Sequence, residues 1–252
     1  MYNRLMYRII SLLALYALLY CGPAANANAK SMPITATSWL VADENGRVIQ
    51  GENITQQRSI ASITKLMTAM VVLDADQDLD EKINGVTRLE LLQIMLIKSD
   101  NKAAETLCEN FPGGRSACIS SMNFKAWNIG LRDTHYADPS GLNVMNVSTA
   151  EELVKIVMKS SEYPVIVKAS NTPHGKLVRE AKKKKHYVSY NNTNPLVATK
   201  DFIVSKTGYI RASGGCIVRM LDTKIGRRIV VLLNSKNMKT RIPEAHKLAL
   251  AY

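Results

Sequence analysis

Apolar, β-like runs lie at both ends of this chain, with a long helical region between them. Two such runs come first, at 35–42 and 47–50, and three come last, at 202–210, 216–221 and 228–233. Strands that precede and follow a block of helices, without βαβ alternation, are typical of an α+β fold. We therefore predict one five-stranded antiparallel sheet flanked by helices, with an inserted helical region.

The helical region is predicted from apolar residues that recur with the α-helical period. Segments with this spacing lie at 63–73, 87–97, 101–108, 115–128 and 149–158, and a final helix is expected at 239–251. Two of them begin with capping boxes, Thr87-Arg88-Leu89-Glu90 and Ser148-Thr149-Ala150-Glu151, in which the hydroxyl and the Glu each satisfy a backbone donor. Because no linker interrupts the pattern, we expect residues 30–252 to form a single domain.

The first 29 residues have the three parts of a secretory signal peptide. Two arginines without any acid precede an apolar run at 9–20, and Ala25-Asn26-Ala27-Asn28-Ala29 follows it. The run is shorter than the about 20 residues that span a bilayer, which disfavours an uncleaved anchor. A lipid anchor at Cys21 is disfavoured because the bulky Tyr20 precedes it. We predict cleavage after Ala27 or Ala29, and export.

The chain carries a formal net charge of +12, and a basic excess favours polyanionic partners. Removal of residues 1–29 takes away two arginines and leaves 31 basic against 21 acidic residues, or +10. The densest run, Lys182-Lys183-Lys184-Lys185, is typical of a solvated loop, and no nucleic-acid-binding motif accompanies it. We expect no nucleic acid as partner, and loose association with anionic envelope polymers as an alternative use of the charge.

The cysteines and histidines have no metal-binding spacing. None of the four Cys forms a C-x-x-C pair, and the four His are scattered, so we predict no structural metal. Export permits disulfides, and a turn at 110–114 separates Cys108 from Cys118. A Cys108–Cys118 disulfide and two buried thiols both remain open, while Cys216 is expected in the core.

Ser62-Ile63-Thr64-Lys65 is the first of three motifs that can carry chemistry. An apolar stripe behind Ser62 predicts that it begins a helix, so that Lys65, at i+3, returns to the same face. A serine hydroxyl needs a base to become a nucleophile, and a buried, neutral Lys can be that base. The alternative is a plain N-cap at Ser62 and a surface Lys65.

The other two motifs are Ser99-Asp100-Asn101 and Lys206-Thr207-Gly208. A turn between two helices can present Ser99 as a proton relay and Asn101 as an amide that holds substrate, although Ser99 or Asp100 can also simply cap the next helix. The Lys206-Thr207-Gly208 motif lies within a β-like run, where a glycine such as Gly208 is typical of close approach by another backbone. Lys206 and Thr207 are candidates to bind a substrate carboxylate, with an ordinary edge strand as the alternative.

These motifs and their neighbours resemble the low-molecular-weight penicillin-binding proteins, which share the S-x-x-K, S-D-N and K-T-G trio with class A β-lactamases. The resemblance covers about residues 35–235, with the motifs in family order. It rests on Ala61–Ala69, Leu91–Leu96 with Ser99–Ala104, Met122-Asn123, Asp138–Leu142 with Val147–Ala150, Asn192–Leu196 and Ser205–Tyr209. Within the family, the chain looks most like D-alanyl-D-alanine endopeptidases of the penicillin-binding protein 7 type, which are periplasmic enzymes that act on peptidoglycan cross-links.

The resemblance implies a serine β-lactamase/transpeptidase-like fold, no cofactor, and covalent inhibition by β-lactam antibiotics. Peptidoglycan stem peptides and cross-links would be its substrates. The implied roles are Ser62 as acylated nucleophile, Lys65 as general base, Ser99 as relay, Asn101 as positioning amide, Lys206 and Thr207 as carboxylate ligands, Gly208 as the residue that gives access, and the backbone N–H groups of Ser62 and Tyr209 as oxyanion hole.

Other activities share these motifs. D-alanyl-D-alanine carboxypeptidases attack the same bond, but they usually continue into a second domain and an amphipathic anchor, so a soluble or loosely attached endopeptidase is expected. A serine β-lactamase needs a deacylating Glu, and Glu151, Glu152, Glu162 and Glu180 lie outside the usual E-x-x-L-N pattern. An inactive peptidoglycan-binding protein is a further alternative, because the segment 81–86 is shorter than in relatives.

Overall fold

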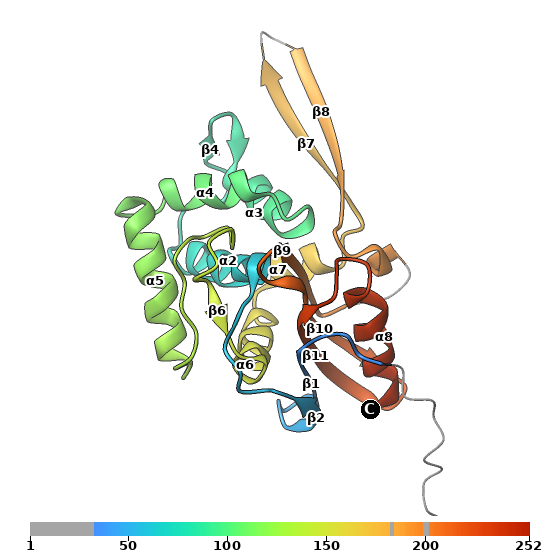
Figure 1. The fold of residues 1–252 in the computed structure, drawn as a ribbon. Helices are drawn as coiled ribbons and strands as arrows, with labels where there is room; N and C mark the ends of the chain where they lie inside the picture. The colour runs from blue at the N-terminus through green and yellow to red at the C-terminus, as the bar shows by residue number, and fades with distance from the viewer. Residues whose placement is uncertain (1–32, 182–183, 199–201) are drawn as a thin grey trace, which may run out of the picture. The chain divides into compact units, whose positions relative to one another are not determined.

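A five-stranded antiparallel sheet forms the centre of the fold, and its strands come from the two ends of the chain (Figure 1). Its order is β2-β1-β11-β10-β9, built from β1 (Ser38–Ala42), β2 (Val48–Glu52), β9 (Val204–Ile210), β10 (Gly214–Thr223) and β11 (Gly226–Ser235). The predicted sheet is thereby confirmed. The computed structural model describes residues 33–181, 184–198 and 202–252, with only the backbone given for 178–181 and 184–186. The expected signal peptide lies outside these residues.

The central strands are apolar on both faces, which explains their nearly continuous hydrophobic runs. In β1, Leu40 and Ala42 join the core on the side of the helical region, whereas Trp39 and Val41 join the core beneath the C-terminal helix. That helix, α8 (Arg241–Ala251), contributes Ala245, Leu248 and Ala249 to the second core. The alternation of strand side chains therefore divides the interior into two cores.

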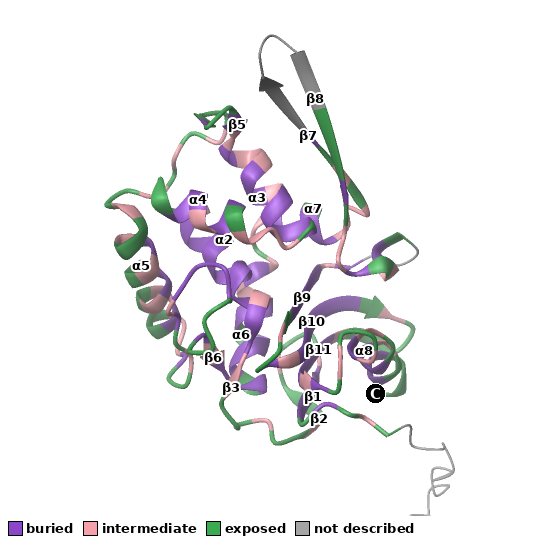
Figure 2. Ribbon diagram, turned by 45° about the horizontal axis from the view of Figure 1, so that its top comes forward, coloured by how far each residue is buried: buried purple, intermediate pink, exposed green. Residues whose placement is uncertain are grey.

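The inserted helical region covers the other face of the sheet. It consists of the short 3-10 helix η1 (Ala61–Thr64), α2 (Lys65–Asp74), α3 (Arg88–Ile97), α4 (Asn101–Glu109), α5 (Gly114–Asn128), α6 (Ala150–Ser160) and α7 (Pro164–Ser170). Helix α2 is buried along most of its length (Figure 2). Among the described residues, no helix is both long and apolar enough to cross a membrane.

One of the two predicted capping boxes is confirmed. Thr87 Oγ1 accepts from the Glu90 N–H at 3.1 Å, and the Glu90 carboxylate accepts from the Thr87 N–H at 2.9 Å. The box at Ser148 is wrong by one residue, because Thr149 caps α6 by accepting from the Glu152 N–H. The Glu152 carboxylate instead accepts from the backbone N–H groups of Arg132 and Asp133, which removes it from the helix end.

Small paired elements connect the larger ones. The segment around 81–86 folds as a hairpin of β4 (Lys82–Ile83) and β5 (Val86–Thr87), and β3 (Arg58–Ser59) pairs with β6 (Val147–Ser148). The Cys108–Cys118 disulfide is present, with Cα atoms 5.4 Å apart, and it joins α4 to α5; Cys216 is a buried free thiol.

The polar stretch after α7 differs from the prediction of a solvated loop. It forms a hairpin of β7 (His174–Ala181) and β8 (Lys184–Asn191) that extends beyond α3 and α4 (Figure 1). The prediction of a loop is wrong for Lys184 and Lys185, which begin β8. Residues 182–183 lie outside the described residues. The short helix η2 (Pro195–Ala198) leads on toward β9.

Candidate active site

Ser62 and Lys65 lie side by side at the start of the helical region. Ser62 is in η1, and Lys65 is the first residue of α2, with its Nζ 2.8 Å from Ser62 Oγ. In a 3-10 turn, residues i and i+3 eclipse one another, which brings the amine onto the hydroxyl. The expected i+3 contact is present, although the turn is 3-10 where an α-helix was predicted. Ala61, just before Ser62, has a φ of 46°, a strained conformation for a non-glycine residue.

Lys65 has two further partners, and both are obligate acceptors. Its Nζ donates to Asn101 Oδ1 at 2.8 Å and to the backbone carbonyl of Ser140. A neutral amine has two hydrogens and one lone pair. If the two carbonyl oxygens take both hydrogens, the lone pair is left for the remaining partner, the Ser62 hydroxyl. The three contacts therefore fix which direction the base faces.

The burial of Lys65 makes its neutral form accessible near neutral pH. Burial lowers the pKa of Lys65 to about 7, although the charges of Asp138, Asp100 and Glu105 oppose this shift. The side chain is completely buried. Near neutral pH, a substantial fraction of Lys65 is consequently deprotonated, as a general base requires. The alternative of a surface Lys65 is wrong.

The Ser99-Asp100-Asn101 turn links α3 to α4. Asp100 caps α4, with Oδ1 accepting from the Ala103 N–H at 2.9 Å, so the alternative of a helix cap is correct for this residue. Ser99 has a left-handed φ of 62°, which is unusual for serine. Its Oγ accepts a hydrogen bond from Lys206 Nζ at 2.8 Å, so the turn contacts two lysines, through Ser99 and through Asn101.

Lys206 and Thr207 lie on β9, the edge strand next to η1. Lys206 is buried, and its pKa is held well below the usual range by burial and then by the charges of Lys65 and Arg241. Thr207 Oγ1 donates to Thr193 Oγ1 at 2.7 Å. An edge strand is present, as the alternative reading had it, but it is not ordinary, because its polar side chains are buried.

Gly208 allows β9 to lie against the backbone that precedes Lys65. A Cβ at this position would come within 2.9 Å of the Ile60 carbonyl oxygen and 3.0 Å of the Ser62 nitrogen. A backbone does lie close to Gly208, but it is the chain's own, and access for a substrate backbone at this position stays a prediction. Tyr209, the next residue of β9, is 41% exposed. Its backbone N–H comes directly after Gly208, the residue that lies against the Ser62 nitrogen.

Sequence reasoning assigned no role to three groups that the structure brings to the site. They are the Ser140 carbonyl, the Thr193 hydroxyl and the Arg241 guanidinium, which donates to the Gly208 carbonyl. A backbone carbonyl carries no side-chain signal, and Thr193 and Arg241 lie far in sequence from the residues they contact. Ser140 and Thr193 do lie within the segments 138–142 and 192–196 that resemble the family, and this resemblance is the one signal in the sequence for them.

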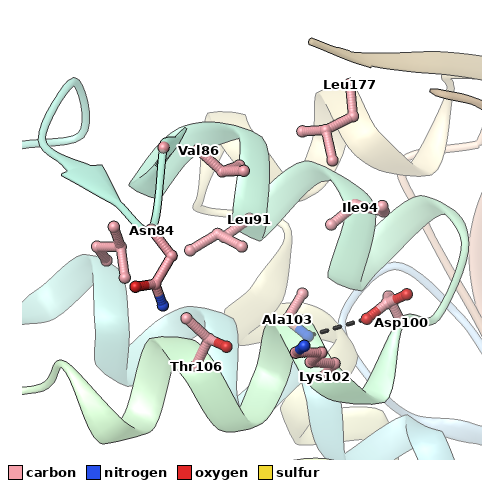
Figure 3. Close-up of a pocket in the computed structure, with 11 residues that line it drawn as sticks. Asn84, Val86, Leu91, Ile94, Asp100, Lys102, Ala103, Thr106 and Leu177 are labelled. Atoms are coloured by element: carbon pink, nitrogen blue, oxygen red, sulfur yellow. Dashed lines mark hydrogen bonds between the residues drawn. The ribbon is translucent and has the colours of Figure 1, made fainter. Parts of the chain in front are cut away.

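A cavity of about 410 Å³ adjoins the site without containing its reactive groups (Figure 3). It lies between α3 and α4 and is bordered by the β4–β5 hairpin, Asp100 and Leu177. Among the described residues, no group of His, Cys, Asp and Glu side chains is arranged to hold a metal ion. The reactive groups that the structure brings together at the site are two buried lysines and two serine hydroxyls.

Comparison with known proteins gives a consistent result. The profile of the peptidase S11 family, D-alanyl-D-alanine carboxypeptidase, matches residues 24–85 and 79–237. A D-alanyl-D-alanine endopeptidase of Pseudomonas aeruginosa is 32% identical over 96% of this chain and 87% of its own length. An Escherichia coli protein of the same name is 35% identical over 83% of this chain and 74% of its own.

Solved structures agree with this relationship. A mutant of a Streptomyces DD-transpeptidase superposes with a TM-score of 0.78 at 25% identity, covering 86% of this chain and 97% of the other. Penicillin-binding protein D2 from Listeria monocytogenes, in its ampicillin-bound form, gives 0.73 at 25% identity, with 86% and 96% covered. The two segments of the family match overlap at 79–85, a stretch that includes β4 and the turn before β5. Since the profile and the relatives span most of the sequence, the chain belongs to the peptidase S11 family of D-alanyl-D-alanine carboxypeptidases.

Proposed function

We propose that this protein is a serine-type D-alanyl-D-alanine endopeptidase that hydrolyses peptidoglycan cross-links through an acyl-enzyme on Ser62. The observation that carries the proposal is the set of contacts at Lys65, with Ser62 Oγ and Asn101 Oδ1 each 2.8 Å from its Nζ. The ammonium form of Lys65 donates to Ser62 Oγ, and once the amine is neutral its lone pair is left for the serine hydroxyl. The residues from 30 to 252 would act as one catalytic domain.

In the acylation step, the neutral Lys65 amine takes the proton of Ser62 while Oγ bonds to the D-alanyl carbonyl carbon. The backbone N–H groups of Ser62 and Tyr209 are proposed to hold the resulting oxyanion. The bond from carbon to the leaving nitrogen then breaks, and that nitrogen receives a proton from the Ser99 hydroxyl, which Lys65 replenishes. Water then adds to the acyl carbon as Lys65 takes one of its protons, the bond from carbon to Oγ breaks, and Lys65 returns that proton to Ser62 Oγ.

Lys206 has two roles in this proposal. Its amine donates to Ser99 Oγ, so the Ser99 hydrogen stays available for the leaving nitrogen. The Arg241 guanidinium also acts on Lys206 as a like charge, and positive charge of this kind favours an anion. We assign the substrate carboxylate to Lys206 and Thr207, and Asn101 to substrate positioning through its amide NH₂, since its oxygen is engaged by Lys65.

The substrate preference follows the relatives. The P. aeruginosa and E. coli proteins are named endopeptidases, whereas more distant relatives are named carboxypeptidases, such as a Bacillus subtilis protein at 24% identity. Trimming of uncross-linked stem peptides is therefore the alternative activity.

Purified protein incubated with cross-linked and linear muropeptides tests this assignment. We expect loss of muropeptide dimers with matching gain of monomers, separated by liquid chromatography, because cross-link cleavage releases two stems. Release of terminal D-Ala from linear pentapeptides with intact dimers would instead establish the carboxypeptidase. If neither product forms, the inactive binding protein becomes the better description.

A β-lactamase activity receives less support from the geometry. Glu152, one of the acids available for deacylation, is buried and accepts from Arg132, Asp133 and Thr134. Its carboxylate oxygens are therefore occupied by hydrogen bonds from the segment 132–134, which precedes the 138–146 loop. We infer slow release of a penicilloyl group and therefore inhibition by β-lactams.

We also propose a periplasmic location, with residues 1–29 as the cleaved leader, and contact of the β7–β8 hairpin with anionic envelope polymers. The hairpin carries the lysine run at 182–185 in sequence. Binding of the protein to purified sacculi should weaken as salt rises from about 0.05 to 0.5 M, because screening shortens the range of charge attraction. Changing the four lysines to glutamine should remove this salt dependence; retention that is unaffected by salt would contradict the proposal.

A further inference from the structure

The loop at 138–146 is fastened at both ends to the segment that carries Ser62 and Lys65. The Ile60 N–H donates to the Asn146 carbonyl at 3.0 Å, and Thr68 Oγ1 donates to the Pro139 carbonyl at 2.7 Å. Between these points, the Ser140 carbonyl accepts from Lys65. The loop thus lies along the segment 60–68, which contains the proposed nucleophile and base.

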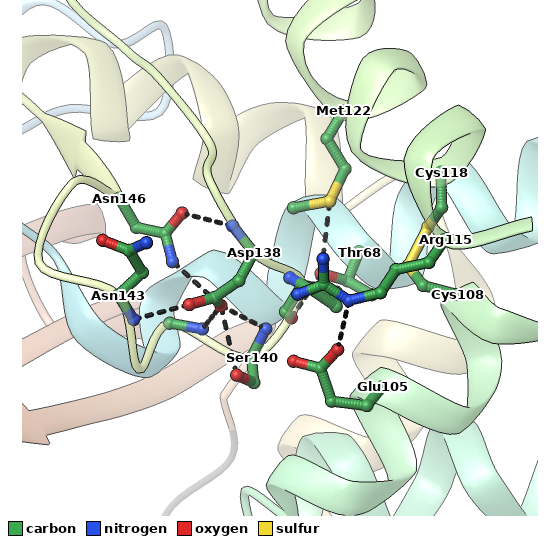
Figure 4. Close-up of polar contacts among 12 residues, drawn as sticks. Thr68, Glu105, Cys108, Arg115, Cys118, Met122, Asp138, Ser140, Asn143 and Asn146 are labelled. Atoms are coloured by element: carbon green, nitrogen blue, oxygen red, sulfur yellow. Dashed lines mark hydrogen bonds and ion pairs between the residues drawn. A yellow bond between two sulfur atoms is a disulfide. The ribbon is translucent and has the colours of Figure 1, made fainter.

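A buried carboxylate determines the shape of this loop (Figure 4). Asp138 accepts from the backbone N–H groups of Ser140 at 2.7 Å, Gly141 at 2.5 Å and Asn143 at 2.5 Å, and from Asn146 Nδ2 at 3.0 Å. Burial alone would raise the pKa of Asp138, but these donors outweigh it and hold the pKa below the usual range. Asp138 is therefore ionised throughout the pH range in which the protein would work.

The loop cannot shift toward Ser62 because its backbone is already in contact there. Gly141 has a φ of 81°, and a Cβ on it would lie 2.1 Å from the Ala61 carbonyl oxygen and 2.8 Å from the Ser62 nitrogen. The Asn146 amide also closes the loop from within, since its oxygen accepts from the Ala137 N–H at 2.7 Å. The position of the Ser140 carbonyl consequently depends on the groups that Asp138 holds together.

We propose that Asp138 is a positioning residue for Lys65: its carboxylate fixes the Ser140 carbonyl, and that carbonyl turns the lone pair of the neutral amine toward Ser62. The inference rests on the proposed roles of Ser62 and Lys65. Asp138 touches neither the hydroxyl nor the reacting carbon, and it acts through one peptide group. Without the carbonyl in place, the amine can rotate, and the lone pair no longer faces the hydroxyl.

The charge of Asp138 has a second, opposing effect on the same amine. The charges that act on Lys65 are those of Asp138, Asp100 and Glu105, which favour its ammonium form, and Lys206 is the buried amine whose own pKa the charge of Lys65 lowers. Removing the Asp138 charge would therefore lower the pKa of Lys65. Positioning and charge predict different readouts, since the first changes the maximal rate and the second changes the pH at which it is reached.

The test is Asp138→Asn, measured as the second-order rate constant of covalent labelling by a fluorescent penicillin between pH 5 and 9. We expect the plateau rate to fall about 100-fold, as for misplaced reacting groups, while the acidic limb of the profile moves to lower pH. A variant that was merely less folded would lose labelled protein at every pH and leave the limb where it is. Asp133→Asn, an exposed acid five residues earlier, is the matched control and should keep the wild-type profile.

A folded Asp138→Asn with wild-type rate and wild-type limb would overturn the inference. If that variant does not fold, Asn146→Ser removes one donor to the carboxylate and keeps its charge, so slower labelling with an unshifted limb is expected; an unchanged rate would again overturn it. Failure of the proposed function looks different, because then wild-type protein would not be labelled, or labelling would not be at Ser62.

Discussion

Ser62→Ala should abolish covalent labelling by a fluorescent penicillin and reduce cleavage of cross-linked muropeptides by at least about 10⁴-fold. The reason is its placement: among the residues that the structure describes, Ser62 alone has its Oγ 2.8 Å from Lys65 Nζ on a turn that packs against the edge strand at Gly208. Without Oγ no ester can form, and the remaining groups can only bind the substrate.

The measurement is gel fluorescence after labelling, with intact-protein mass spectrometry to count acyl adducts. One adduct is expected on wild type and none on the variant. Ser116→Ala, an exposed serine of α5, is the matched control and should label like wild type. An adduct that persists on folded Ser62→Ala would show that the nucleophile lies elsewhere.

Ser99→Ala is tested in the same experiment and should lose only part of the labelling activity. Its hydroxyl contacts Lys206, not Ser62, so labelling should slow without disappearing. The comparison separates the group that forms the ester from the group that transfers a proton. Equal and complete loss in both variants would contradict this division of roles.

The sheet, the Thr87 helix cap and the three motifs could be predicted from sequence because each depends on local pattern. Strands buried on both faces are mostly apolar, and a capping box needs only residues three apart. The β7–β8 hairpin escaped prediction because its exposed residues, such as Tyr187, show no clean apolar alternation. Helix α7 escaped because its apolar run is short.

At the site, too, the residues could be predicted from local sequence patterns, whereas the contacts between distant residues could not. Side chains with distinctive chemistry were found, since S-x-x-K and K-T-G can be read from the sequence. Their mutual contacts were not predictable: Lys206 reaches Ser99 across 107 residues, and the Ser140 carbonyl reaches Lys65 across 75. The strained φ values at Ala61 and Ser99 likewise have no sequence signal, because neither residue is a glycine.

Lys65→Arg should lower the rate of penicillin acylation by about 10³-fold and remove its dependence on pH between 6 and 8. Arginine keeps a cation at this position but cannot be deprotonated in a protein. In wild type the pKa of Lys65 is lowered to about 7. Below that pH the amine is protonated and cannot accept the Ser62 proton, so the rate should rise about tenfold per pH unit and then level off above pH 7.

The profile is measured as labelling rate against pH, with denaturation curves at each pH to show that both proteins stay folded. The chain provides a matched control in its second S-x-x-K sequence, Ser99 to Lys102, where Lys102 is exposed. Lys102→Arg should leave both rate and profile unchanged, because a solvated ammonium is not the base. If folded Lys65→Arg kept the wild-type limb, another group would be titrating, and the lowered pKa of Lys65 would have to serve a purpose other than proton transfer from Ser62.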